Sequence, residues 1–274
     1  MTLLPLHFAV QDFNVSLPTN TIFYIGPMPV TNSMLLGLFG VAVMLGALIY
    51  VRQMVLAGRY NRFVGLVQWA FEGFYNTCYE IVPNREVARG IAPLALSIFF
   101  TVLTTYWVSI LPGVGESITW GEGSLLRGLP TDLNFTFALA LISMVAAQFY
   151  AMKVHGFFGN IGRYIKNPLK DPLGAFEGFL EIIGELSRLV ALSFRLFGNA
   201  FAGEVLLMIV GIMSSYGAAL SLPFFLAFEL FIGFIQAYVF YMLTLIFTSL
   251  AVMSHGGDHE PAREIRKPKE VPAK

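Results

Sequence analysis

Five long runs of apolar residues divide the chain. A helix of about 20 apolar residues is roughly 30 Å long, which matches the hydrocarbon thickness of a bilayer. The first three runs are close to this length and the last two are much longer. The pattern therefore predicts five membrane-spanning helices, over residues 33–51, 90–113, 133–152, 178–216 and 222–253.

A further helix of a different kind is predicted between the first two spans. In the segment RYNRFVGLVQWAFEGFYNTCYEIV, apolar residues such as Phe63, Leu66 and Phe74 recur at helical spacing, and Glu72 lies opposite them. One apolar and one polar face are typical of a helix in the membrane interface. The expected fold class is all-α: a polytopic membrane protein with five membrane segments plus an interfacial amphipathic helix.

The last two apolar runs are too long to cross a bilayer upright. As helices, residues 178–216 would extend roughly 58 Å and residues 222–253 about 48 Å. Both helices could project into water, but the second carries only Glu229 as a charged residue before the tail. We therefore expect the two segments to form a long, strongly tilted helical hairpin around the sequence MSSYGAALSLP.

The distribution of basic residues predicts the orientation of the chain. Five Lys and Arg residues lie in 52–90 and five in 153–188, but only one lies in 113–131. Loops rich in Lys and Arg remain in the cytoplasm. The N-terminus is therefore expected outside and the C-terminus in the cytoplasm. The predicted parts are an outer-side N-terminal segment (1–32), a membrane domain (33–254) and a cytoplasmic tail (255–274).

Composition agrees with a membrane location and limits the possible chemistry. The chain is 56% hydrophobic and 12% charged, with a mean hydropathy of +0.69. Its single cysteine, Cys78, excludes an internal disulfide and any cysteine-based metal cluster. No Walker-type glycine loop is present, and the segment HGGDH belongs to a tail with the composition of a disordered segment. We expect no cofactor, no metal, no bound nucleotide and no nucleic-acid partner.

Two charged residues occur where the chain is otherwise apolar. An arginine at mid-membrane costs at least about 2.5–3.5 kcal/mol, so Arg195 is expected to have a functional role. Glu204 is nine residues away, which places it on the opposite face of a straight helix, while Asn199 is one turn from Arg195 on the same side. The small residues Gly198 and Ala202 would permit packing within this chain, or would leave room for another helix.

The second long segment adds another acid. Glu229 and Gln236 are seven residues apart and share a face of the helix. In an antiparallel hairpin, Glu204 and Glu229 could face one polar cavity. Buried carboxylates hold their protons more tightly, and a nearby arginine has the opposite effect. The pattern indicates a proton pathway that is interrupted by the fixed positive charge of Arg195.

The sequence resembles a known family. LSRLVALSFRLFGNAFAGE, followed by LPFFLAFELFIGFIQAYVFYMLTLIFTSLA, is similar to subunit a of the F-type ATP synthase membrane sector. MPVTNSMLLGLF, PTDLNFTFALAL and GRYIKNP support the resemblance, which covers about residues 20–254.

The resemblance implies a role beside a rotating c-subunit ring. In this family, two offset half-channels lead protons to the ring carboxylates, and the arginine, here Arg195, separates them. Ion flow turns the ring, and other ATP synthase subunits make ATP, so this chain would not be an enzyme. Further implied partners are peripheral-stalk b-type subunits and membrane lipid. The acidic pair and the long N-terminal segment favour a bacterial plasma (inner) membrane, with an organelle membrane as the alternative. By position, the proton-translocation residues would be Arg195, the outer-side acids Glu204 and Glu229, the polar lining Asn199, Gln236 and Asn134, and Ser187 on the cytoplasmic side.

Two positions depart from the family pattern. Leu189 follows Arg188 where many relatives have proline, so the helix is expected to run straighter. Glu204 and Glu229 are both acidic, whereas many relatives have a histidine at one position, and the choice between H⁺ and Na⁺ remains open. An alternative class is a proton-coupled secondary transporter. That class should show paired repeats and short broken helices, and the sequence has neither.

Overall fold

A computed structural model describes residues 21–111, 119–120, 123–124, 127–164, 172–213 and 218–253. The predicted cytoplasmic tail, with its HGGDH segment, and most of the predicted N-terminal segment lie outside these residues.

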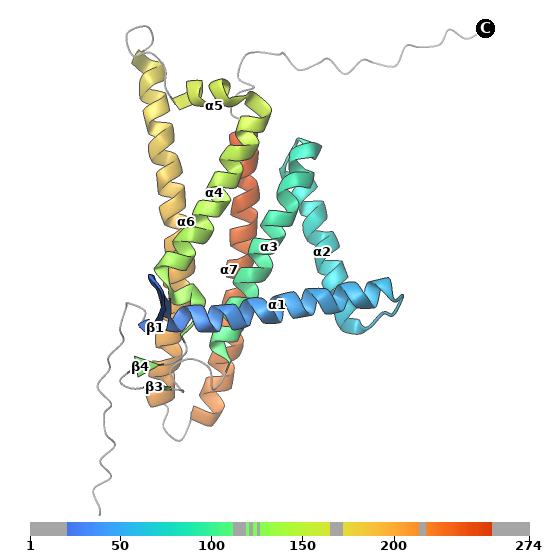
Figure 1. The fold of residues 1–274 in the computed structure, drawn as a ribbon, viewed down its shortest axis with the longest axis vertical. Helices are drawn as coiled ribbons and strands as arrows, with labels where there is room; N and C mark the ends of the chain where they lie inside the picture. Colours follow the sequence, from blue (N-terminus) through green and yellow to red (C-terminus); the bar gives the residue numbers. More distant parts are fainter. Residues whose placement is uncertain are drawn as a thin grey trace, which may run out of the picture.

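Helices make up most of the described chain (Figure 1). Five of them are long and apolar enough to cross a membrane, and α2 is the expected amphipathic helix, so the all-α polytopic fold class is confirmed. The helices are α1 (Asn32–Leu56), α2 (Arg62–Ile81), α3 (Arg85–Ile110), α4 (Leu133–His155), α5 (Phe157–Tyr164), α6 (Pro172–Met213) and α7 (Ala218–Met253), with a short 3-10 helix η1 (Leu129–Thr131) before α4.

Four short strands were not predicted. Strands β1 (Thr21–Ile25) and β2 (Met28–Thr31) pair antiparallel, and β3 (Thr119–Trp120) pairs with β4 (Gly123–Ser124). The chain turns between β1 and β2 at Gly26, whose φ of +63° favours glycine.

Polar side chains define where two of the long helices begin. The Thr31 hydroxyl accepts a hydrogen bond from the Met34 backbone N–H at the start of α1, and Asp132 caps α4 by accepting from Asn134 N–H. The Ser33 hydroxyl donates to the Asp132 carboxylate at 2.8 Å, in a buried position. This hydrogen bond fixes the start of α1 against the start of α4.

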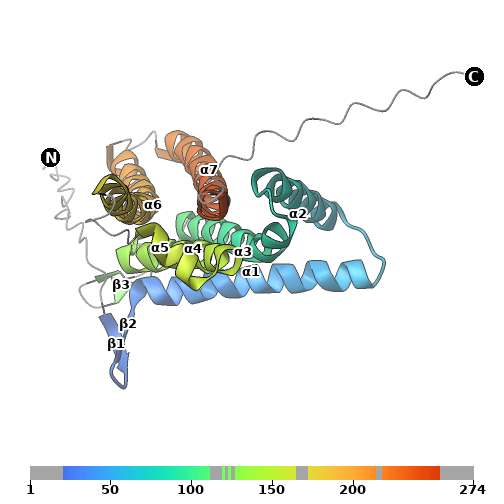
Figure 2. The ribbon, with the colours of Figure 1, turned by 90° about the horizontal axis from the view of Figure 1, so that it is seen from above.

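The helices form layers. Figure 2 shows α3 and α4 between α1 on one side and the pair α6 and α7 on the other. In both views α1 runs crosswise to α6 and α7. The crossing is close because Gly40 packs against Thr105 of α3, and Gly37 against the side chain of Leu129. Helix α2 lies to one side, where Phe71 stacks on Phe100 of α3 at 4.8 Å between ring centroids.

Helices α6 and α7 form an antiparallel hairpin (Figure 1). Helix α6 has 42 residues and runs without a break past Leu189, over about 63 Å. Helix α7 already begins at Ala218, so the AALSLP part of the sequence around which the hairpin was expected is helical. Near a helix start, a proline such as Pro223 removes a single intrahelical hydrogen bond. Because α1 lies crosswise to this hairpin, the two cannot both stand along a membrane normal.

Candidate functional site

The buried centre of the hairpin is the carboxylate of Glu229 on α7, which is only 2% exposed. The Tyr106 hydroxyl, from α3, donates a hydrogen bond to Glu229 Oε1 at 2.5 Å. Gly203 of α6 lies directly against the same carboxylate, and a Cβ atom at this position would overlap it. Three helices therefore enclose the acid, and within the described residues Tyr106 is its hydrogen-bond donor.

Tyr106 was not among the residues expected at the site. Its ring also packs against Gly233, one turn from Glu229 on α7, and its hydroxyl lies 3.4 Å from the Asn199 carbonyl oxygen. A tyrosine hydroxyl inside an apolar span needs a polar partner, which is the signal that could have identified it.

Two of the predicted lining residues form a pair across the hairpin. Asn199 of α6 donates from Nδ2 to Gln236 Oε1 of α7 at 2.8 Å. Gln236 is 3% exposed, and its Nε2 finds no acceptor in the part of the chain that the structure describes. The site thus presents a buried N–H₂ group beside the pair, two helical turns from Glu229.

Arg195 is directed away from the bundle. One face of α6 packs inward through buried residues such as Leu192, Leu196 and Ala200. Arg195 is exposed, and among the described residues its guanidinium makes no hydrogen bond or ion pair. Arg195 and Glu204 therefore form no salt bridge with each other within the described residues. The exposed stripe comprises Ser187, Val190, Ala191, Phe194, Arg195, Gly198, Asn199 and Ala202.

The remaining predicted site residues have more peripheral positions. Glu204 is half-buried and follows Gly203, so it lies at the same level of the hairpin as Glu229. Ser187 is exposed on α6, eight residues before Arg195. Asn134 is exposed at the start of α4. Neither Asn134 nor Ser187 joins the Tyr106–Glu229 cluster within the described part of the chain.

Small residues on α6 could permit packing within this chain or leave room for another helix, and each interpretation holds at a different position. A Cβ at Gly198 would meet nothing within 4 Å, whereas one at Gly203 would overlap Glu229. Gly203 therefore serves packing within the chain, and Gly198 leaves open space beside Arg195. Among the described residues, no group of three His, Cys, Asp or Glu side chains could hold a metal ion.

The fold and site define a helical membrane protein with a buried carboxylate inside a hairpin and, on its outside, an arginine that has no partner within the described residues. The family model for the ATP synthase A chain matches residues 33–249. The chain belongs to this family, and it is an integral membrane subunit of the F-type ATP synthase complex, in a bacterial-type membrane.

Similar proteins carry the same assignment. ATP synthase subunit a of Desulforamulus reducens is 38% identical over 199 residues, which are 70% of this chain and 67% of that protein. The protein of that name from Pseudoalteromonas atlantica is 34% identical over 210 residues, which are 67% of this chain and 77% of that one. Subunit a of Marinomonas sp. is 33% identical over 182 residues, which are 61% of this chain and 64% of that protein.

Proposed function

We propose that this chain is the stator beside a rotating c-subunit ring, where it forms two offset proton half-channels that Arg195 separates. The observation that carries the proposal is the exposure of Arg195 without a partner among the described residues. It is exposed on a helix long and apolar enough to span the membrane, and no group in the described chain neutralises it. A cation at membrane depth is costly unless it meets an opposite charge. A carboxylate on the ring would supply that charge.

The surroundings of Arg195 suit a moving partner helix. Gly198 and Ala202 are exposed on the same face, and small residues allow a second helix to approach closely. Both hairpin helices also expose large apolar side chains, such as Phe194 (54%) and Phe231 (59%). An apolar face with one fixed positive charge would hold an ionised carboxylate and release it only when rotation brings the next one.

The buried carboxylate belongs, in this proposal, to the outer half-channel. Glu229 has one hydroxyl donor in Tyr106, and the Asn199–Gln236 pair continues the polar path along the hairpin toward Arg195. Glu204 lies at the level of Glu229, with Asn134 and Ser187 as exposed positions toward the two surfaces. Each proton that crosses yields about 2.3 kcal/mol per 100 mV, which turns the ring and is coupled to ATP synthesis in other subunits.

The orientation proposed from the sequence is an outer N-terminus and a cytoplasmic C-terminus. In this orientation α5 lies on the cytoplasmic side. The crosswise position of α1 supports a strong tilt of the hairpin, because α1 has a length close to that of the hydrocarbon core. The proposed location is a bacterial plasma (inner) membrane, with peripheral-stalk b-type subunits as further partners. The continuous helices α6 and α7 do not favour the alternative of a proton-coupled secondary transporter, which uses broken helices.

The test is ATP-driven proton pumping by the whole complex in membrane vesicles, with wild type and Arg195→Ala. Loss of pumping, with the subunit still assembled and passive proton leak raised, is the expected result. Arg62→Ala, at an exposed position on α2, serves as the matched control. Normal pumping by an assembled Arg195→Ala complex would overturn the proposal.

A further inference from the structure

A second polar cluster surrounds a carboxylate on the other side of Arg195 along α6. Glu185 is ten residues before Arg195, about 15 Å along the helix, whereas the Gly203–Glu229 contact is eight residues after it, about 12 Å away. The exposed arginine therefore lies between two clusters that each contain an acid. The second cluster is at the end of the hairpin where α5 connects α4 toward α6 (Figure 1).

Three elements contribute to the hydrogen bonds of this cluster. Glu185 Oε1 accepts from Gln148 Nε2 of α4 and from the Tyr164 hydroxyl of α5, each at 2.5 Å. Gln148 Nε2 also lies 2.9 Å from the Tyr164 oxygen, and Gln148 Oε1 accepts from Asn160 Nδ2 at 3.1 Å. One carboxylate oxygen is thus held in place by two donors from two different helices.

The cluster is not sealed within the chain. Glu185 is half-buried, so the described residues leave part of its side chain uncovered. Asn160 is 5% exposed, and its Oδ1 has no hydrogen-bond donor in the described part of the chain. A buried amide oxygen of this kind is an acceptor that an ordered water satisfies. The Glu185 carboxylate, the Tyr164 phenol and the two side-chain amides, Gln148 and Asn160, thus form a connected set of hydrogen-bond donors and acceptors.

Charged and titratable groups around Glu185 come from each packed element. On α6, Glu181 lies one turn before it and Arg188 one turn after it, with the Arg188 guanidinium 5.5 Å from the centre of the Phe247 ring on α7. Helix α5 contributes Tyr164, and α4 ends in His155, whose Nε2 contacts the Val252 carbonyl oxygen at 2.6 Å. Arg188 is thus drawn toward α7, while the donors from α4 and α5 hold Glu185.

We propose that Glu185 is the proton carrier of the second half-channel, with Tyr164 and Gln148 as its positioning residues. The inference rests on the proposed function. It assigns the side chain that takes up protons on the side of the membrane where α5 lies. During ATP-driven pumping, Glu185 accepts a proton from water on that side. It then gives the proton through water to a ring carboxylate and returns to its anionic form, so atoms and charge balance over the cycle.

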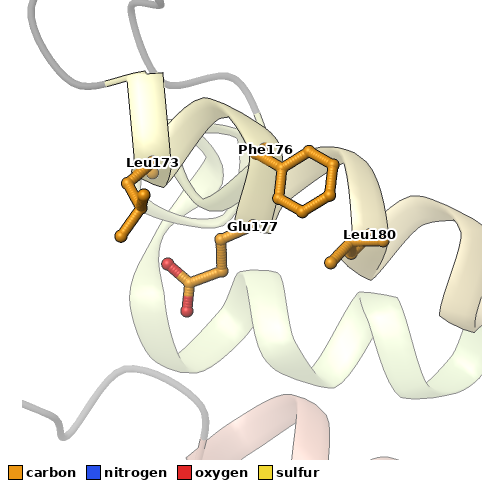
Figure 3. Close-up of a pocket in the computed structure, with 5 residues that line it drawn as sticks. Leu173, Phe176, Glu177 and Leu180 are labelled. Carbon is orange, nitrogen blue, oxygen red and sulfur yellow. The ribbon is translucent and has the colours of Figure 1, made fainter.

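The test uses inverted vesicles that contain the whole complex, with the rate of ATP-driven pumping recorded against outer pH. Glu185→Gln keeps the shape and an acceptor oxygen but cannot carry a proton, so pumping should fall at least tenfold with the subunit assembled. Glu185→Asp keeps the acid and should retain more pumping. Glu177→Gln is the matched control, because this exposed α6 glutamate lines a separate surface cavity with Leu173, Phe176 and Leu180 (Figure 3) and should pump as wild type.

A second variant keeps the proposal testable if the Glu185 variants do not assemble. Tyr164→Phe removes one of the two donors that position the Glu185 carboxylate, so the profile of pumping against outer pH should change while the subunit stays assembled. An unchanged pH profile would overturn the inference, as would pumping by assembled Glu185→Gln at half the wild-type rate or more. Loss in Arg195→Ala together with normal pumping in Glu185→Gln would reject this inference alone. Normal pumping in Arg195→Ala would reject the proposed function.

Discussion

Gly203 of α6 and Glu229 of α7 are in direct contact, with the carboxylate occupying the space that a side chain at position 203 would fill. The glycine therefore determines where the acid can lie. Glu229 is 2% exposed and accepts from Tyr106 of α3, so a side chain at position 203 could push the carboxylate aside only at the expense of this hydrogen bond. The contact links the packing of the hairpin to the position of its buried charge.

Gly203→Ala should therefore damage both stability and function. Overpacking a filled site costs about 1–3 kcal/mol, and here the displaced group is a carboxylate with a fixed donor. We expect a lower midpoint of thermal unfolding for the detergent-solubilised complex and at least a tenfold loss of ATP-driven pumping. Gly184→Ala is the control on the same helix, because its Cβ would meet nothing within 4 Å. Equal behaviour of the two variants would contradict the structure.

Tyr106→Phe tests the hydrogen bond to the acid. The substitution removes only the hydroxyl and leaves Glu229 Oε1 without this donor, which costs about 1–3 kcal/mol for a buried group. Pumping should fall severalfold while the subunit remains in the complex. In a double-mutant cycle with Glu229→Leu, which removes the acceptor, the second substitution should add little, because both remove the same interaction. Fully additive effects would show that Tyr106 acts independently of Glu229.

The apolar pattern predicted most of the architecture, since bilayer thickness sets helix length directly. Five spans, the amphipathic helix and the hairpin all follow from the spacing of apolar residues. Helical periodicity also placed Arg195 and Glu204 on opposite faces. Helical spacing also grouped Asn199 with Arg195 and Gln236 with Glu229. The resemblance then named both as polar lining, and the structure joins them by a hydrogen bond.

Contacts between distant segments could not be predicted in the same way. Tyr106 meets Glu229 across 123 positions of sequence, and nothing in the local pattern gives the rotation of α3 that produces the contact. Glu185 and Tyr164 meet because α5 folds back on α6, which depends on the geometry at the end of α4. The short strands around Gly26 were missed because no apolar alternation marks them.

Cys78 offers a test of how α2 packs against the start of α3. The side chain is 1% exposed, its thiol donates to the Ala88 carbonyl oxygen at 3.4 Å, and burial raises the pKa of the thiol to about 11. At pH 8, roughly one such thiol in a thousand is ionised, against about a quarter for an ordinary cysteine. We expect iodoacetamide to leave Cys78 unmodified in native membranes at pH 8, as measured by intact mass, and to modify it after denaturation.

The sign of the pH dependence follows from the same pKa. The folded state favours the protonated thiol, so this contribution to stability is complete below the unfolded pKa near 8.5 and declines as pH rises toward about 11. The control is Gly65→Cys in a Cys78→Ala background, because Gly65 is exposed on α2 with open space around it. That cysteine should react at pH 8 in native membranes. Rapid labelling of Cys78 under the same conditions would mean that α2 does not pack against α3 as the structure shows.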